Sequence, residues 1–76
     1  MNINDFIVKY AEEMEIENAS ELIPTTNFRD NGDWSSLAHL NLIAFLDEYF
    51  DIQIDNSELK KLVTIQDIFN FIENNK

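Results

Sequence analysis

The sequence predicts an all-α fold, a small bundle of three longer helices and one short helix with a long first loop. Apolar residues recur at helical spacing in several segments, and one glycine and one proline leave few forced breaks. The chain has no cysteine, so a domain of 76 residues with a thin core must be stabilised by packed helices rather than disulfides. We expect a single domain over residues 1–76.

The first helix is predicted over residues 3–14. Asn2 or Asn4 is a suitable cap, and Asp5 favours a helix N-terminus. One apolar stripe is formed by Ile3, Phe6, Ile7, Tyr10 and Met14.

A long loop is predicted over residues 16–33, because polar residues and Pro24 interrupt the helical pattern. Leu22, Ile23 and Phe28 are expected to anchor it in the core. It ends in a turn-forming cluster at residues 30–33. Loops of this length in small domains are often functional.

The second helix is predicted over Ser36–Phe50, with Ser35 or Asp33 as its cap. One apolar stripe for the core comprises His39, Leu42, Ile43, Leu46 and Phe50. A second side of the helix carries Leu37, Leu40, Asn41, Ala44, Asp47 and Glu48. Exposed apolar residues ringed by acids indicate a contact surface.

Residues 51–55 alternate between polar and apolar, which is typical of a strand, but no second strand is available for pairing. We therefore expect an extended loop with Ile52 and Ile54 turned inward. A short helix should follow over residues 55–61, with Leu59 and Leu62 facing the core. The last helix starts at Thr64, where Asp67 three residues later forms a capping-box pattern. Its apolar side comprises Ile65, Ile68, Phe69, Phe71 and Ile72.

The net charge of −10 argues against binding to nucleic acid or to anionic membrane surfaces. It either steers the chain toward basic patches on other proteins or serves solubility alone. No apolar run has the roughly 18 residues of a membrane span, and the N-terminus lacks the pattern of a secretory signal. The expected protein is soluble, cytoplasmic and monomeric.

Few residues are suited to catalysis. His39 is the only imidazole, and it comes three residues after Ser36 on the predicted helix, so a shared face is possible and a small hydrolase stays a distant alternative. Adjacent acids lie on exposed helix faces rather than across a cleft. The turn at residues 30–33 lacks the ligand spacing of a calcium loop, and we expect no metal site. Ser36 at a helix N-terminus suits a covalently attached phosphate, although a capping serine is usually structural.

The segment from Ser36-Leu37 through Leu40 to Ile54 resembles an acyl carrier protein. That family shows an Asp-Ser-Leu tripeptide, an amphipathic helix ending in acids and Phe, and an Ile-x-Ile stretch. Residues 63–67, Val-Thr-Ile-Gln-Asp, resemble the start of the family's last helix. The order and spacing of these motifs match over essentially the whole chain.

The resemblance implies that Ser36 carries a 4'-phosphopantetheine arm, transferred from coenzyme A by a phosphopantetheinyl transferase. Acyl or aminoacyl cargo would then be held as a thioester and passed among loading and transferring enzymes. The face that such partners read through basic patches would be Leu37, Leu40, Asn41, Ala44, Asp47 and Glu48. An acyl pocket would be lined by Phe28, Leu42, Leu46, Ile54, Leu59, Leu62, Ile68 and Phe71, which ordinary core packing explains equally well.

One position departs from the family pattern, because Ser35 replaces the usual Asp before the attachment serine. Ser36 is preferred as the attachment site, since Leu37 follows it and the downstream register fits. Trp34 favours a carrier of a specialised pathway over the general carrier of fatty acid biosynthesis. The alternative is an unmodified acidic helical module that docks on a basic partner.

Overall fold

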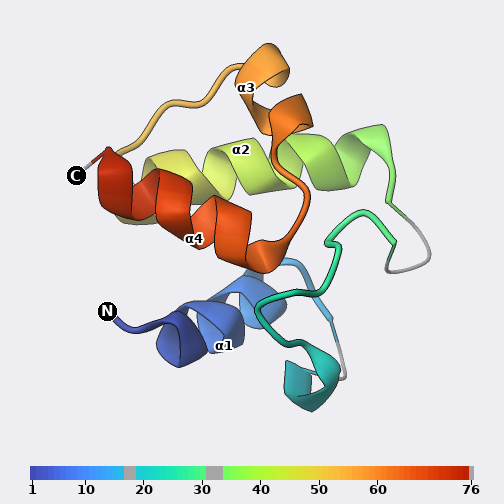
Figure 1. The fold of residues 1–76 in the computed structure, drawn as a ribbon. Coiled ribbons are helices and arrows are strands. Elements are labelled where there is room, and N and C mark those ends of the chain that lie inside the picture. Colours follow the sequence, from blue (N-terminus) through green and yellow to red (C-terminus); the bar gives the residue numbers. More distant parts are fainter. Residues whose placement is uncertain (17–18, 31–33, 76) are drawn as a thin grey trace.

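The computed structural model describes residues 1–16, 19–30 and 34–75 of the chain (Figure 1). Its elements are α1 (Ile3–Glu13), the 3₁₀ helix η1 (Ala19–Glu21), α2 (Ser36–Phe50), α3 (Asn56–Lys61) and α4 (Ile65–Asn74). The only strand-like pairing within these residues is an isolated bridge between Asn27 and Thr64. The predicted all-α architecture of three longer helices and a short one is confirmed.

The helices form a small bundle around one core. α1 and α4 pack against each other, α2 runs on the far side of α4, and α3 lies above α2 (Figure 1). The start of α2 lies at the opposite end of the molecule from both chain termini in this view. The first residues of α2 are therefore well separated from the two ends of the chain.

Each α-helix begins at a side chain that accepts a hydrogen bond from a free amide of the first turn. The caps are Asn2 for α1, Ser35 for α2, Asp55 for α3 and Thr64 for α4. Such caps satisfy amides that have no partner within the helix. The sequence left Asn4 open as an alternative to Asn2, and the structure selects Asn2.

Helix α2 ends at Asp51, whose backbone is left-handed with φ 55°. Its N–H donates to the carbonyl of Asp47 at 3.0 Å, and the N–H of Ile52 donates to the carbonyl of Leu46 at 3.2 Å. This hydrogen-bonded ending is a common way to stop a helix and turn the chain. It directs Ile52 and Ile54 inward, each 5% exposed, which confirms the predicted extended loop.

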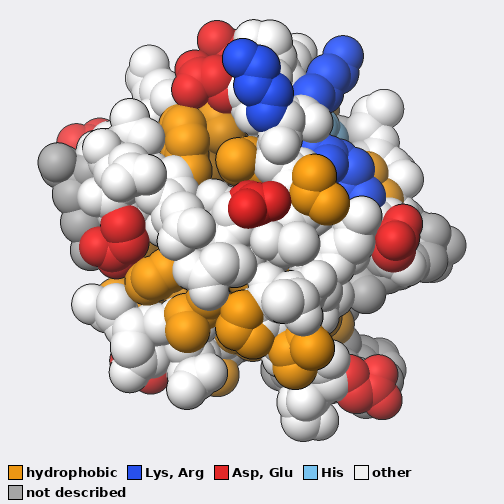
Figure 2. Space-filling model, in the orientation of Figure 1, with side chains coloured by type: hydrophobic (Ala, Val, Ile, Leu, Met, Phe, Trp, Pro, Cys, Tyr) orange, Lys and Arg blue, Asp and Glu red, His pale blue; other side chains and the backbone are white. Residues whose placement is uncertain are grey.

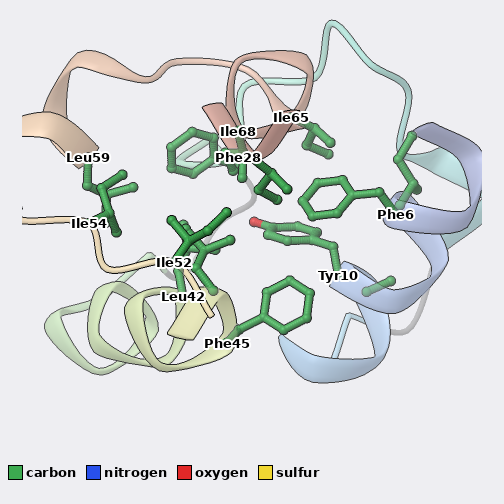
Figure 3. Packing of buried hydrophobic residues seen from close by; sticks show 14 of the residues in the cluster. Phe6, Tyr10, Phe28, Leu42, Phe45, Ile52, Ile54, Leu59, Ile65 and Ile68 are labelled. Carbon is green, nitrogen blue, oxygen red and sulfur yellow. The ribbon is translucent and has the colours of Figure 1, made fainter. Parts of the chain in front are cut away.

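The core is assembled from every helix and from the connecting segments (Figure 3). Phe6 lies at its aromatic centre, with ring centroids 5.7 Å from Phe69, 6.0 Å from Phe50 and 6.1 Å from both Tyr10 and Phe45. Phe45 is buried, although the predicted core stripe of α2 omitted it. His39, Ile43 and Phe50, which that stripe included, are only partly buried. The apolar stripe of α2 is thus rotated toward Phe45.

The described part of the connection between α1 and α2 has more regular structure than predicted. It contains η1, and Leu22 and Phe28 are buried as expected. The expectation for Ile23 was wrong, because this side chain is 55% exposed. The N–H of Ile23 donates to the hydroxyl of Thr26, and the N–H of Thr26 donates back to the carbonyl of Ile23. This local turn is closed by its own hydrogen bonds and leaves the Ile23 side chain outside.

Arg29 fixes the same connection to α3. Its guanidinium lies over the ring of Phe28, 4.6 Å from the centroid, and donates to the backbone carbonyls of Leu59, at 2.6 Å, and Leu62. These carbonyls lie at the C-terminal end of α3, where a cation is favourable. The remainder of the predicted turn at residues 30–33, after Asp30, lies outside the described residues.

Charged side chains of the two signs are unevenly spread over the face seen in Figure 2. Lysine and arginine gather at the α3 side, where Lys60 and Lys61 occupy the last turn. Acidic side chains are scattered over the rest of this face. In the described part of the chain, no helix is both long enough and apolar enough to cross a bilayer.

Candidate functional site

The start of α2 is fixed by Ser35. Its backbone is extended, at φ −123° and ψ 175°, and its side-chain oxygen accepts the N–H of Ala38 at 3.3 Å. Its carbonyl accepts the N–H of His39 at 3.0 Å, the first hydrogen bond of the helix. Asp33, the other predicted cap, lies outside the described residues. Ser35 therefore acts as the N-cap, and Ser36 becomes the first residue of the helix.

Ser36 is exposed, and its hydroxyl makes no hydrogen bond to any described residue. It lies in an open depression with a volume of about 630 Å³ between the starts of α2 and α3. The residues around Ser36 in this depression are Trp34, Ser35, His39, Leu40, Asn56 and Lys60. The hydroxyl is accessible, and the depression offers aromatic, polar and cationic groups beside it.

The first turn of α2 differs electrostatically from those of the other helices. Asp5 lies in the first turn of α1, Glu58 in that of α3 and Asp67 in that of α4. The first turn of α2 has no acidic side chain. Free amides and the helix dipole make a helix N-terminus favourable for negative charge. Among the described residues, no carboxylate lies in the first turn of α2 to fill this favourable position.

His39 is directed to α3 rather than to Ser36. Its Nε2 atom lies 2.9 Å from the side-chain oxygen of Asn56, the first residue of α3. Nothing in the described structure joins the imidazole to the Ser36 hydroxyl by a hydrogen bond. A serine nucleophile needs a base within hydrogen-bond reach, so this arrangement does not favour the hydrolase alternative. His39 instead holds the first turns of α2 and α3 together.

The second side of α2 forms one exposed surface. Leu37 is 67% exposed and Leu40 60% exposed, which is unusual for residues of this size. The remaining residues of the predicted partner-reading face, namely Asn41, Ala44, Asp47 and Glu48, are exposed as well. The structure therefore brings all six side chains to the solvent on the helix that begins at Ser36.

The residues predicted to line an acyl pocket lie in the core. Leu62 and Phe71 are partly buried. The other six are buried, namely Phe28, Leu42, Leu46, Ile54, Leu59 and Ile68. Among these eight, Phe28 alone lines one of the two described hollows in the molecule. Their packing is that of an ordinary core, and their contact with a cargo stays a prediction.

The sequence interpretation did not single out a second hollow, with a volume of about 280 Å³. It is lined by Tyr10, Met14, Glu15, Ile16, Phe28, Trp34 and Ala38. Three of these residues belong to the apolar stripe of α1 or to the predicted anchors, so periodicity indicated burial but not a void. The signal available in the sequence was Tyr10, a residue with a polar tip in an apolar stripe.

The relatives found by comparison with known proteins include three acyl carrier proteins. The chain is 31% identical over 64 residues to an acyl carrier protein of Thermosynechococcus vestitus, covering 84% of this chain and 78% of that protein. It is 32% identical over 62 residues to an acyl carrier protein of Desulforapulum autotrophicum, covering 82% and 80%.

A third relative, an acyl carrier protein of Thermobifida fusca, is 30% identical over 71 residues, covering 93% of this chain and 90% of that protein. A scan against models of protein families gives no match. The relatives nevertheless align over most of their own length and most of this chain, and the helix order agrees with the resemblance drawn from the motifs. The chain belongs to the acyl carrier protein family.

Proposed function

We propose that this protein carries acyl groups, as thioesters, on a 4'-phosphopantetheine arm attached to the hydroxyl oxygen of Ser36. The observation that carries the proposal is an exposed serine hydroxyl, without a hydrogen bond to any described residue, at the first position of α2, the one described helix whose first turn lacks an acid. Membership of the acyl carrier protein family supports the same role. The protein itself would be a carrier and not a catalyst.

Ser36 is preferred over Ser35 because the two hydroxyls have different surroundings. The Ser35 oxygen is engaged as the N-cap, where it accepts the N–H of Ala38. Serine and aspartate are both good N-cap residues, so Ser35 performs the structural part of the role of the usual Asp. Because Ser35 stands where the family usually has Asp, the helix start carries one negative charge fewer. The Ser36 hydroxyl can react without loss of a cap.

The surroundings of Ser36 fit a phosphodiester. Unfilled amide N–H groups of the first turn and the positive end of the α2 dipole favour its negative charge. Lys60 contributes a cation to the depression, and Trp34 and Leu40 contribute apolar surface along which an arm can lie. When bound, the arm supplies the thiol that the chain, which has no cysteine, lacks.

The exposed face of α2 is the proposed contact for partner enzymes. Leu37 and Leu40 offer apolar contacts close to Ser36, and Asp47 and Glu48 lie further along the same helix. No hydrogen bond or ion pair engages either carboxylate within the described residues. A partner with a basic patch beside an apolar groove would complement this face. Such partners are the phosphopantetheinyl transferase and enzymes that load or transfer acyl groups, or aminoacyl groups in a specialised pathway.

The test of the proposal is intact-protein mass spectrometry after incubation with coenzyme A and a broad-specificity phosphopantetheinyl transferase. The wild type should gain the mass of one phosphopantetheine, and Ser36→Ala should gain none. Ser35→Ala is the matched control and should still be modified. Circular dichroism must show that both variants keep their helices.

Two results would contradict the proposal. Modification of Ser36→Ala would move the attachment to another residue. A wild type that gains no mass with several transferases would leave the unmodified docking module as the better reading. That module would bind a basic partner with an affinity that falls with salt and falls by roughly tenfold or more in Asp47→Lys or Glu48→Lys.

A further inference from the structure

Helix α3 contributes little to the core and depends on polar contacts for its position. It has six residues, of which only Leu59 is buried. The guanidinium of Arg29 holds the carbonyl of Leu59, and Asn56 is bonded to the imidazole of His39 on α2. A helix of this length is not stable by itself, so these contacts keep it in place. A further contact with α2 would therefore change how firmly α3 is held.

Lys60 is the cation of α3 that faces the proposed attachment site. Lys60 and Lys61 are both exposed in the last turn of α3, on the side of the molecule where basic side chains gather (Figure 2). Lys60 lines the depression that contains Ser36, whereas Lys61 is not among the residues around it. Two neighbouring lysines of one short helix thus differ in their relation to the serine.

The Lys60 ammonium is available to an anion. None of the described residues forms a hydrogen bond or ion pair with it, and no described carboxylate lines the depression. His39, which lines the same depression, is already bonded to Asn56. The chain has 15 acidic and 5 basic residues, so a hollow with a lysine and no described acid departs from the composition of the whole. A lysine has a flexible four-carbon stem, so its ammonium can turn toward a group on Ser36.

We propose that Lys60 binds the phosphodiester that joins the arm to Ser36, and that this ion pair holds α3 against α2. The inference rests on the proposed function, because the phosphodiester enters the depression only with the arm. It assigns the contact to one lysine and makes the attachment of α3 depend on modification. The modified and unmodified forms of the carrier would then differ in the α2–α3 junction as well as in the arm.

The chemistry of the two groups explains the pairing. The phosphodiester carries a negative charge and oxygen acceptors, and an ammonium donates charge-assisted hydrogen bonds to such oxygens. One partner is covalently fixed at the first residue of α2, and the other lies in the last turn of α3. The depression is open, so water screens the pair and its effect on stability should be small. The test must therefore isolate one charge.

The first measurement is Tm of the full chain before and after modification with coenzyme A and a phosphopantetheinyl transferase. Modification should raise Tm of the wild type by about 2 to 4 °C more than that of Lys60→Gln, the shift expected from one exposed ion pair in a domain of this size. The free amides of α2 act on the phosphodiester in both proteins. Their effect therefore cancels in the comparison.

Lys61→Gln is the matched control. It removes the same charge from the same helical turn, but the side chain does not line the depression. Its gain in Tm on modification should equal that of the wild type. Equal gains in the wild type and Lys60→Gln would overturn the inference. Equal reductions in Lys60→Gln and Lys61→Gln would also overturn it, because they would show a general effect of net charge.

Hydrogen exchange measures the effect on α3 directly. The N–H groups of Leu59 and Leu62 are hydrogen-bonded in and next to α3, at 3.0 and 3.1 Å. Both should exchange about two- to fivefold more slowly after modification of the wild type, and at an unchanged rate after modification of Lys60→Gln. The bonded N–H of Met14, at the end of α1, is the internal reference. Equal slowing at Met14 would contradict a local effect on α3.

These failures are distinguishable from failure of the proposed function. Mass spectrometry of each sample shows whether the arm is attached before Tm or exchange is measured. A wild type that is not modified contradicts the attachment to Ser36. A modified protein whose Tm gain and exchange rates do not depend on Lys60 contradicts only the role of this lysine.

Discussion

Helices α2 and α4 both begin at a hydroxyl cap, but their first turns are built in opposite ways. At α4 the Thr64 oxygen accepts the N–H of Asp67 at 3.1 Å, and the Asp67 carboxylate accepts the N–H groups of Val63 and Thr64, each at 3.0 Å. At α2 the equivalent of Asp67 is Ala38, which has no carboxylate to return the hydrogen bond. The start of α4 is therefore closed by its own acid.

The residues at the first helical position show the same contrast. Ile65 of α4 is 0% exposed and belongs to the core, whereas Ser36 of α2 is exposed in an open depression. Within the described residues, the start of α4 is closed by an acid and buried, whereas the start of α2 is open and exposed. Four experiments test this difference between the two helix starts.

The largest effect is expected from alanine at the first helical position of each helix. Ile65→Ala should lower the free energy of unfolding by about 2 to 5 kcal/mol, because a fully buried side chain is deleted. Ser36→Ala should change it by no more than about 0.5 kcal/mol, since the side chain is exposed and unpartnered. Urea unfolding followed by circular dichroism measures both.

Ile65→Ala removes a large part of the stability of so small a domain, so Ile65→Val is a milder substitute. Its expected cost is about 0.5 to 1.5 kcal/mol. A cost for Ser36→Ala as large as that of Ile65→Val would mean that Ser36 has a structural role and would weaken the comparison.

A smaller effect is expected from removal of the two caps. Thr64→Ala should cost about 1 to 2 kcal/mol of unfolding free energy, because it also releases the Asp67 side of a reciprocal pair. Ser35→Ala should cost about 0.5 to 1 kcal/mol, since its hydrogen bond to Ala38 is longer, at 3.3 Å, and is not reciprocated. Chemical unfolding measures both losses of unfolding free energy. A larger loss in Ser35→Ala than in Thr64→Ala would show that the start of α2 is the more strongly capped of the two.

A third experiment closes the start of α2 deliberately. Ala38→Glu places an acid where α4 has Asp67 and should raise the stability of the unmodified protein by about 0.3 to 1 kcal/mol. The same carboxylate would repel a phosphodiester on Ser36, so modification should slow in a mass-spectrometric time course. Ala44→Glu adds the same charge further along α2 and should give no gain in unfolding free energy. An unchanged rate of modification in Ala38→Glu would contradict the idea that an open first turn serves the arm.

The smallest expected effect is on the stability of the protein at low pH. Hydrogen bonds from the backbone N–H groups of Thr64 and Val63 hold the pKa of Asp67 below its ordinary value of 3.8. A carboxylate with a depressed folded-state pKa stabilises the fold above the unfolded value, and this contribution is lost as the pH falls below about 3.8. Asp67→Asn should therefore lose less stability than the wild type between about pH 5 and about pH 3. Equal losses in the two proteins would show that the carboxylate does not act as described.

Much of the fold was predictable because local rules specify it. The apolar spacing indicated every longer helix, the capping pattern at Thr64 located the start of α4, and Ile52 and Ile54 turned inward as expected. The prediction of burial was wrong where a local turn decides which way a side chain points. Ile23 was placed in the core because it is apolar, but hydrogen bonds with Thr26 leave it exposed.

The site was predictable to a similar extent. Sequence spacing was sufficient to predict that Leu37, Leu40 and the acids of α2 share one exposed face, because residues three and four apart lie on the same side of a helix. Their role in binding partners stays a prediction. Sequence spacing could not show that His39 bonds to Asn56 of another helix, since 17 residues separate the two. It also could not show that Trp34 borders two hollows.

The helices, the capping box of α4, the acidic charge and the serine at the start of α2 follow from the sequence, because each depends on residues within a few positions of one another. The cap chosen at each helix, the carbonyls that the guanidinium of Arg29 binds and the lack of a partner for the Tyr10 hydroxyl are visible only in the folded chain. The last two outcomes depend on contacts between segments far apart in the chain. Periodicity predicts that a side chain is buried, but packing decides what surrounds it.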